Sequence, residues 1–170
     1  QDSTQYVSNP DGVLSAEAED AINRSMARMD RELGIESAVI AVWHVENDDV
    51  FRFAQDVFDH YKIGKEDRGL VIVLATDDRK VRTHTGYSLE GDLTDVECKR
   101  LQDQYLVPYM KVNQPDEGLK ALTEALFCYL SKKDMPVAKE PTASDDSDVD
   151  WQLLFITGSI IAWLLALWGF

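Results

Sequence analysis

Residues 69–85, GLVIVLATDDRKVRTHT, decide the fold of this chain. The run 69–75 is apolar after its first glycine and rich in β-branched side chains, which is typical of a strand buried on both faces of a sheet. Residues 80–85 alternate in character and predict a half-exposed edge strand. Because only the short polar stretch 76–79 separates the two runs, we expect them to pair as an antiparallel hairpin.

Helical and strand patterns alternate ahead of this hairpin. Ser15 is an N-cap residue before an acidic first turn and an apolar stripe, and Gly34 ends that predicted helix. Residues 38–45, AVIAVWHV, are a near-continuous apolar run that predicts a second buried strand. Asp49 begins a second helix with apolar residues at helical spacing, and Gly64 ends it.

The chain after the hairpin is predicted to be helical. Residues 94–97, TDVE, are a capping-box signature for a third helix, which we expect Pro108 to close. Residues 113–115 open a fourth helix. A further edge strand is expected from 5–8 or from 106–112. The order of elements predicts an α/β domain with a small mixed sheet between helical layers.

The charge of the chain is unevenly distributed. The formal net charge is −14, from 31 acidic and 17 basic residues. Residues 139–150 contain five acids and one lysine, and residues 151–170 contain no charge, so residues 1–138 hold the other −10. An acidic domain without a basic patch repels a phosphate backbone, which excludes nucleic acid as the expected partner.

The C-terminal stretch 151–170, WQLLFITGSIIAWLLALWGF, predicts one transmembrane helix. Twenty residues at about 1.5 Å per residue span roughly 30 Å, the thickness of the hydrocarbon core of a bilayer. We assign Trp151, Trp163 and Trp168 to this anchor, with Trp151 and Trp168 at its two interfaces. The alternative is a buried core helix, but residues 1–150 offer little to cover such a helix on all sides.

The charges that flank this span predict its orientation. Lys and Arg favour the cytoplasmic side, and the segment before the span is acidic, so the domain is expected in a periplasm or lumen. A removed signal peptide accounts for the start at Gln1, and so does truncation. We therefore expect an extracytoplasmic domain at 1–133, an acidic linker at 134–150 and a single membrane pass at 151–170.

The predicted topology divides the acidic residues of the domain into two groups. A right-handed crossover makes the two buried strands parallel. Residues 77–78 then lie at the carboxyl end of the sheet with residues 48–49. Asp67, Glu90 and Asp95 lie at its amino end. At about 3.3 Å per residue the two groups are roughly 30 Å apart, too far to share one ion.

The group at the amino end is the predicted metal site. Asp67, Glu90 and Asp95 come from different loops, and carboxylates with loop carbonyls are what Ca²⁺ or Mg²⁺ requires. Such an ion would orient a phosphate ester and activate water. Two structural explanations compete with this hypothesis, because Asp95 fits the first turn of a helix and Asp67 fits a surface pair with Arg68.

Other reactive side chains have simpler interpretations. The sequence has no second histidine at ligand spacing, and Ser88 is the one candidate nucleophile, in a loop flanked by glycines. Cys98 and Cys128 are interpreted as small buried thiols, with a disulfide as the alternative in an oxidising compartment. The three histidines are His44, His60 and His84.

Several motifs resemble the TPM domain family. Residues 6–15, YVSNPDGVLS, resemble its opening motif, and residues 67–74 with 78–82 resemble its central hairpin. Residues 85–91, TGYSLEG, followed by 93–95, LTD, resemble its most specific stretch. Pro108 and Gly118 match its closing pattern. The resemblance covers about residues 5–131.

This resemblance implies a three-layer α/β/α sandwich, often exported and often followed by a membrane span. Members include a thylakoid-lumen acid phosphatase linked to photosystem II repair and an auxiliary protein of an acetylcholine receptor. Divalent-cation binding is part of what the resemblance implies. The chain departs from the family at Asn9, usually Asp, at Arg68, usually Asn, and at Ser88, usually Gly. The first two changes weaken cation binding by charge.

Two functions follow as expectations. The first is an accessory, stabilising, assembly or repair subunit of an integral-membrane complex, photosynthetic or respiratory, without catalysis of its own. The alternative is a divalent-metal-assisted acid phosphatase on the outer side of the membrane, with Asp67, Glu90 and Asp95 as its metal ligands.

Overall fold

The structure is a computed structural model, and it describes residues 5–141 of the chain. The predicted membrane helix, with Trp151, Trp163 and Trp168, lies outside these residues, as does most of the predicted linker. No helix within 5–141 combines the length and the apolar character that crossing a membrane requires.

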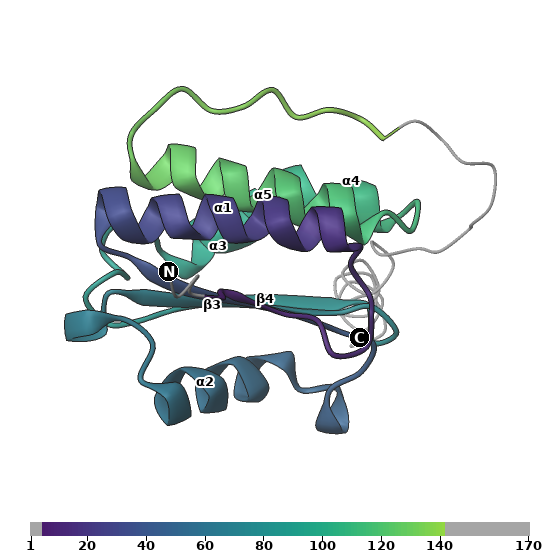
Figure 1. Cartoon of the computed structure of the whole chain (residues 1–170), viewed down its shortest axis with the longest axis horizontal. Helices are drawn as coiled ribbons and strands as arrows, with labels where there is room; N and C mark the ends of the chain where they lie inside the picture. Colours follow the sequence, from purple (N-terminus) through teal and green to yellow (C-terminus); the bar gives the residue numbers. More distant parts are fainter. Residues whose placement is uncertain (1–4, 142–170) are drawn as a thin grey trace, which may run out of the picture.

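The described residues form a four-stranded mixed sheet with helices on both faces (Figure 1). The strands are β1 (Val7–Ser8), β2 (Glu36–Val42), β3 (Gly69–Ala75) and β4 (Lys80–Thr85). The helices are α1 (Ala16–Leu33), α2 (Val50–Tyr61), α3 (Asp95–Leu101), α4 (Val107–Met110) and α5 (Pro115–Leu130), with 3₁₀ turns η1 (Glu46–Asp48) and η2 (Lys65–Asp67) and a π-helical turn η3 (Gln102–Leu106).

The sheet has the order β1-β2-β3-β4. Strands β1, β2 and β3 are parallel, and β4 pairs antiparallel to β3, which confirms the predicted hairpin and the parallel pair. The further edge strand comes from the first of the two predicted segments, since Val7 pairs with Val39. We call the end of the sheet where β1, β2 and β3 finish its carboxyl end, and the opposite end its amino end.

Alternate residues of the central strands face two separate cores. Ile72 and Leu74 of β3 pack with α1, α3 and α5, while Val71 and Val73 pack with α2. Figure 1 shows α2 alone on one face of the sheet and α1, α3, α4 and α5 on the other. Every residue of β3 is buried, as expected of a central strand in a parallel sheet. The predicted α/β fold with a small mixed sheet is confirmed.

The predicted helix boundaries follow local hydrogen bonding. The hydroxyl of Ser15 accepts the N–H of Ala18, and Gly34 adopts a left-handed conformation with φ of 65° at the end of α1. The hydroxyl of Thr94 likewise accepts the N–H of Glu97 at the start of α3. Helix α2 ends earlier than predicted, because Lys62 rather than Gly64 takes the left-handed conformation.

Two predicted boundaries are wrong. The second buried strand is β2, which ends at Val42, so Trp43 and His44 lie beyond it. Pro108 does not close the third helix, because the chain continues through η3 into α4 with the proline in the first turn of α4. The π-helical turn η3 directly precedes the proline, and its wider pairing, with the N–H of Val107 donating to the carbonyl of Gln102, is how the helix accommodates Pro108.

The segment after α5 returns across the helical layer. Figure 1 shows it running back over α5 toward the beginning of that helix. The hydroxyl of Tyr105 donates to the carbonyl of Pro136 at 2.8 Å, which ties the segment to η3. The described chain therefore leaves the domain along the layer formed by α1, α4 and α5.

Candidate functional site

Backbone pairing at the carboxyl end of the sheet extends past the last residues of β2 and β3. The N–H of Thr76 donates to the carbonyl of Val42 at 3.0 Å, and the N–H of Asp77 donates to that of Trp43 at 2.7 Å. These bonds hold residues 43–44 beside residues 76–78. In open α/β sheets, ligands bind preferentially at this end of the strands.

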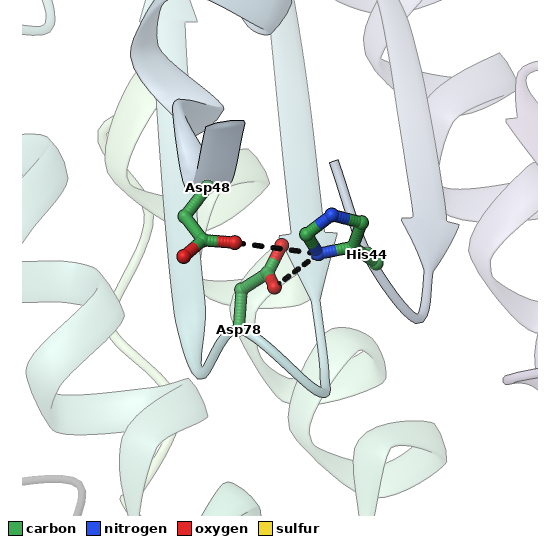
Figure 2. A group of neighbouring side chains, drawn as sticks. All are labelled: His44, Asp48 and Asp78. Atoms are coloured by element: carbon green, nitrogen blue, oxygen red, sulfur yellow. Dashed lines mark hydrogen bonds and ion pairs between the residues drawn. The ribbon is translucent and has the colours of Figure 1, made fainter. Parts of the chain in front are cut away.

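One histidine and two carboxylates meet here, as Figure 2 shows. Nδ1 of His44 lies 2.5 Å from Oδ1 of Asp78 and 3.3 Å from Oδ1 of Asp48. The other oxygen of Asp78 accepts the backbone N–H of Val45 at 2.8 Å. His44 and Asp48 both lie in the connection between β2 and α2, and Asp78 lies in the β3–β4 turn, so two segments supply the cluster.

The charges of this cluster support one another. Hydrogen bonding to Asp78 raises the pKa of His44 above its ordinary value, against the effect of desolvation. The pKa of Asp78 is lowered, since desolvation is outweighed by the hydrogen bonds from the Val45 N–H and from His44. His44 and Asp48 are exposed, whereas the side chain of Asp78 is only 6% exposed. A charged imidazolium beside a charged carboxylate is therefore favoured.

The cluster also has the composition of a metal site. One ligand atom from each of His44, Asp48 and Asp78 lies within 4.8 Å of the other two, and no other such group occurs in the described part of the chain. An imidazole with carboxylates suits Zn²⁺ or another transition metal, whereas Ca²⁺ and Mg²⁺ prefer oxygen alone. An ion would have to displace the proton from Nδ1 of His44, so binding would strengthen as the pH rises.

A pocket of about 570 Å³ opens at the same end of the sheet, and its lining includes Trp43 and Asp77, the chain neighbours of His44 and Asp78. Four segments line it: the loop before α1, the residue after β2, the residues after β3, and the beginning of α5. Its lining residues are Gly12, Val13, Trp43, Thr76, Asp77, Asn113, Gln114, Pro115, Asp116 and Glu117. The lining thus combines three carboxylates with one large aromatic side chain and has no basic residue.

The predicted metal ligands at the amino end are not brought together. Asp67, Glu90 and Asp95 do not form a group of the spacing found around His44 within residues 5–141. Asp95 instead lies 3.5 Å from Arg82. The predicted surface pair of Asp67 with Arg68 is also not the observed one, since Arg68 faces Asp92 at 3.4 Å. A metal site there stays a prediction without a preformed cluster to support it.

The remaining reactive residues take structural positions. His84 packs edge-on against Phe58 with ring centroids 5.1 Å apart, and burial lowers its pKa. Cys98 and Cys128 are free and buried, so the disulfide alternative is not realised. Burial raises the pKa of Cys98 to about 12, which keeps the thiol protonated and unreactive. Ser88 is exposed in the loop that follows β4.

Sequence reasoning missed His44 because it placed this residue inside a strand. The topology argument did place the residues around it, since residues 48–49 and 77–78 were expected at the carboxyl end. The usable signal was that His44 directly follows the apolar run of a parallel strand, where side chains from neighbouring crossovers converge.

Comparison with known proteins gives one family and several similar structures. The TPM domain matches residues 7–129. No curated protein matches the chain. The solution structure of the N-terminal domain of a protein from P. gingivalis is similar, with a TM-score of 0.72 and 28% identity over 77% of this chain and 85% of that one.

Two further solution structures share the fold. The BA42 protein of the psychrophilic bacterium Bizionia argentinensis has a TM-score of 0.62 and 23% identity, over 83% of this chain and 93% of that one. The N-terminal domain of the cg2496 protein of Corynebacterium glutamicum has a TM-score of 0.61 and 12% identity, over 86% and 90%. At these identities the likeness concerns the fold alone.

Proposed function

Because the chain belongs to the TPM domain family, we propose that it is a binding subunit that serves an integral-membrane complex from the outer side of the membrane. Residues 151–170 would anchor it, and the acidic stretch 139–150 would hold the domain clear of the bilayer. In this proposal the domain acts by recognition, and a partner protein occupies the carboxyl end of its sheet.

The observation that carries this proposal is the pocket beside Trp43. Its lining offers carboxylates, amides and an aromatic ring, which are groups suited to recognition. It contains no histidine or cysteine, and its one hydroxyl, on Thr76, lies within 3.5 Å of the carbonyl of Val42. Trp43 is 54% exposed, and exposed aromatic side chains are enriched where proteins bind one another.

The proposal is tested by isolating the full chain from its native membranes in a mild detergent. We expect recovery in a complex with other membrane proteins. The variant Trp43→Leu should reduce that recovery, while Tyr87→Leu, which removes a side chain that is 83% exposed at the other end of the sheet, should leave it unchanged. Recovery of the wild-type chain as a lone monomer would count against the proposal.

The cluster of His44, Asp48 and Asp78 supports a second candidate function, a metal-assisted phosphatase. A divalent ion at these side chains would supply a Lewis acid and lower the pKa of a bound water. This candidate keeps the predicted chemistry but moves it from the amino end of the sheet to the carboxyl end.

A phosphatase assay with single substitutions separates the two locations. Hydrolysis of a generic phosphate ester is measured with Mg²⁺, Ca²⁺ or Zn²⁺ for the wild type, Asp78→Asn and Asp67→Asn. Loss only in Asp78→Asn supports the cluster at His44, and loss only in Asp67→Asn supports the predicted site. Equal activity in all three proteins, or no activity in the wild type, rejects both metal sites as catalytic centres.

A further inference from the structure

The charge of the Trp43 pocket indicates what it binds. We infer that it receives a cationic group, the ammonium or guanidinium of a Lys or Arg side chain on a basic segment of a partner polypeptide. The inference rests on the proposed function, since it names the chemistry that this same pocket would recognise on the partner.

Trp43 is held in place by its backbone. Its N–H donates to Oδ2 of Asp11 at 2.9 Å, and its carbonyl accepts the N–H of Asp77 at 2.7 Å. Trp43 remains 54% exposed to solvent. An exposed indole beside a carboxylate is suited to a cation, which the ring face attracts while the carboxylate pairs with its charge.

The three carboxylates of the pocket differ in how far they are already neutralised. Glu117 pairs with Lys120 at 2.6 Å, and one oxygen of Asp116 accepts the N–H of Ser15 at 3.0 Å. Asp77 makes no side-chain hydrogen bond or ion pair with another residue between 5 and 141. Asp77 and the second oxygen of Asp116 therefore remain available to a ligand.

The beginnings of α1 and α5 lie near the pocket and oppose this negative charge. A helix N-terminus is equivalent to about half a positive charge. After Lys120 neutralises Glu117, the two full negative charges of Asp77 and Asp116 still exceed the two helix ends together, which amount to about one positive charge. The local field is negative, so the pocket attracts a cation and repels a phosphate.

The dimensions fit a side chain presented by a partner. A volume of about 570 Å³ lies within the usual range of about 300–1,000 Å³ for ligand pockets. The amide groups of Asn113 and Gln114 in the lining can bind the polypeptide backbone that carries the cationic side chain. A free polyamine shares the cationic chemistry but lacks such a backbone.

The test measures binding of a short fluorescent peptide rich in Arg and Lys to the full chain in detergent micelles, at physiological ionic strength. We expect Trp43→Leu and Asp77→Asn each to weaken binding by about three- to tenfold, the range of a desolvated cation–π or charge contact. Trp43→Phe should retain part of the affinity, because its ring still attracts a cation.

Two matched controls separate this pocket from the general acidity of the chain. Glu66→Gln removes one charge, and Tyr87→Leu removes one exposed aromatic side chain, both at the amino end of the sheet. Each should change the affinity by less than about twofold. Equal weakening by Asp77→Asn and Glu66→Gln, or no binding by the wild type, would overturn the inference.

Spermidine and inorganic phosphate serve as competitors. Displacement of the peptide by spermidine, with the same dependence on Trp43, would support the pocket as a cation site open to small molecules. Failure of spermidine to displace it would support a polypeptide ligand. Displacement by phosphate would contradict the inference.

A failure of peptide binding can be told apart from a failure of the proposed function. If the peptide does not bind but the membrane complex is recovered, the inference fails and the proposed function stands. If the peptide binds with the expected dependence but the chain is recovered alone, the inference stands and the proposed function fails.

Discussion

The two ends of the sheet have similar acidic composition but different chemistry. At the amino end two of the acids lie beside arginines, with Asp92 near Arg68 and Asp95 near Arg82. At the carboxyl end, Asp48 and Asp78 share the imidazole of His44 (Figure 2), and Asp77 has no ion-pair partner among the described residues. Unpaired or shared charge is available to a ligand, whereas a paired acid is already satisfied.

The backbone differs between the ends as well. At the amino end, three glycines lie against neighbouring backbone: Gly64, Gly69 and Gly86. A Cβ added at Gly86 would overlap the carbonyl of Asp67. The pocket at the carboxyl end is open, and nothing lies within 4 Å of a Cβ added at Gly12. The amino end is closely packed around these three glycines, whereas the pocket at the carboxyl end leaves room for a partner.

The largest expected effect on stability comes from a substitution that disrupts this packing. Gly86→Ala forces a methyl group into the backbone at Asp67, and overpacking of this kind lowers the free energy of unfolding by about 2–3 kcal/mol. Urea denaturation of the fragment 1–141, followed by circular dichroism, measures it. Gly91→Ala is the control, since no atom lies within 4 Å of its added Cβ; a similar loss there would show that packing is not the cause.

The next effect compares one acid from each end. Asp78→Ala leaves the N–H of Val45 without the carboxylate that accepts it, so we expect a loss of about 1–2 kcal/mol in the free energy of unfolding. Asp92→Ala removes an exposed pair with Arg68 and should cost less than about 0.5 kcal/mol. The same denaturation measurement applies, and equal losses would remove the distinction between the two ends.

The smallest effect is electrostatic and is visible in the histidines. NMR titration should place the pKa of His44 above 6.5 because Asp78 binds it, and that of His84 below 6.5 because it is buried and near Arg82. In Asp78→Asn the pKa of His44 should fall toward 6.5, while that of His84 stays unchanged. A His44 that titrates alike in both proteins would rule out the bond.

The pKa shifts of His44 and Asp78 make the free energy of unfolding depend on pH. The raised pKa of His44 contributes stability that is complete below pH 6.5 and is lost as the pH rises through the folded-state value. The lowered pKa of Asp78 contributes stability above pH 3.8 that is lost on acidification. The stability difference between the wild type and Asp78→Asn should therefore be greatest between pH 3.8 and 6.5.

Most of the fold could be predicted because its signals are local. Ser15 and Thr94 accept N–H groups within their own first turns, and the hairpin follows from two adjacent runs of residues. The prediction that Pro108 closes the third helix was wrong, because whether a proline ends a helix depends on whether the helix widens next to it. That widening occurs in η3, whose position reflects packing rather than the proline alone.

The candidate site was only half predictable. The topology correctly placed Asp48 and Asp78 at one end of the sheet, but it gave no reason to prefer them over Asp67, Glu90 and Asp95. The preference appears only when side-chain distances and arginine partners are known, because ligand distances depend on contacts between segments that are far apart in the chain.

The sequence by itself determined the α/β class, the hairpin, the helix caps and the uneven distribution of charge, because these depend on residue type and short-range periodicity. The tertiary structure alone decided which acids are paired with arginines, which meet at His44, and that Trp43, Asp77 and Asp116 line one pocket. Those features join β2, β3 and α5, and only the folded chain brings these elements within the few ångströms over which ion pairs and hydrogen bonds act.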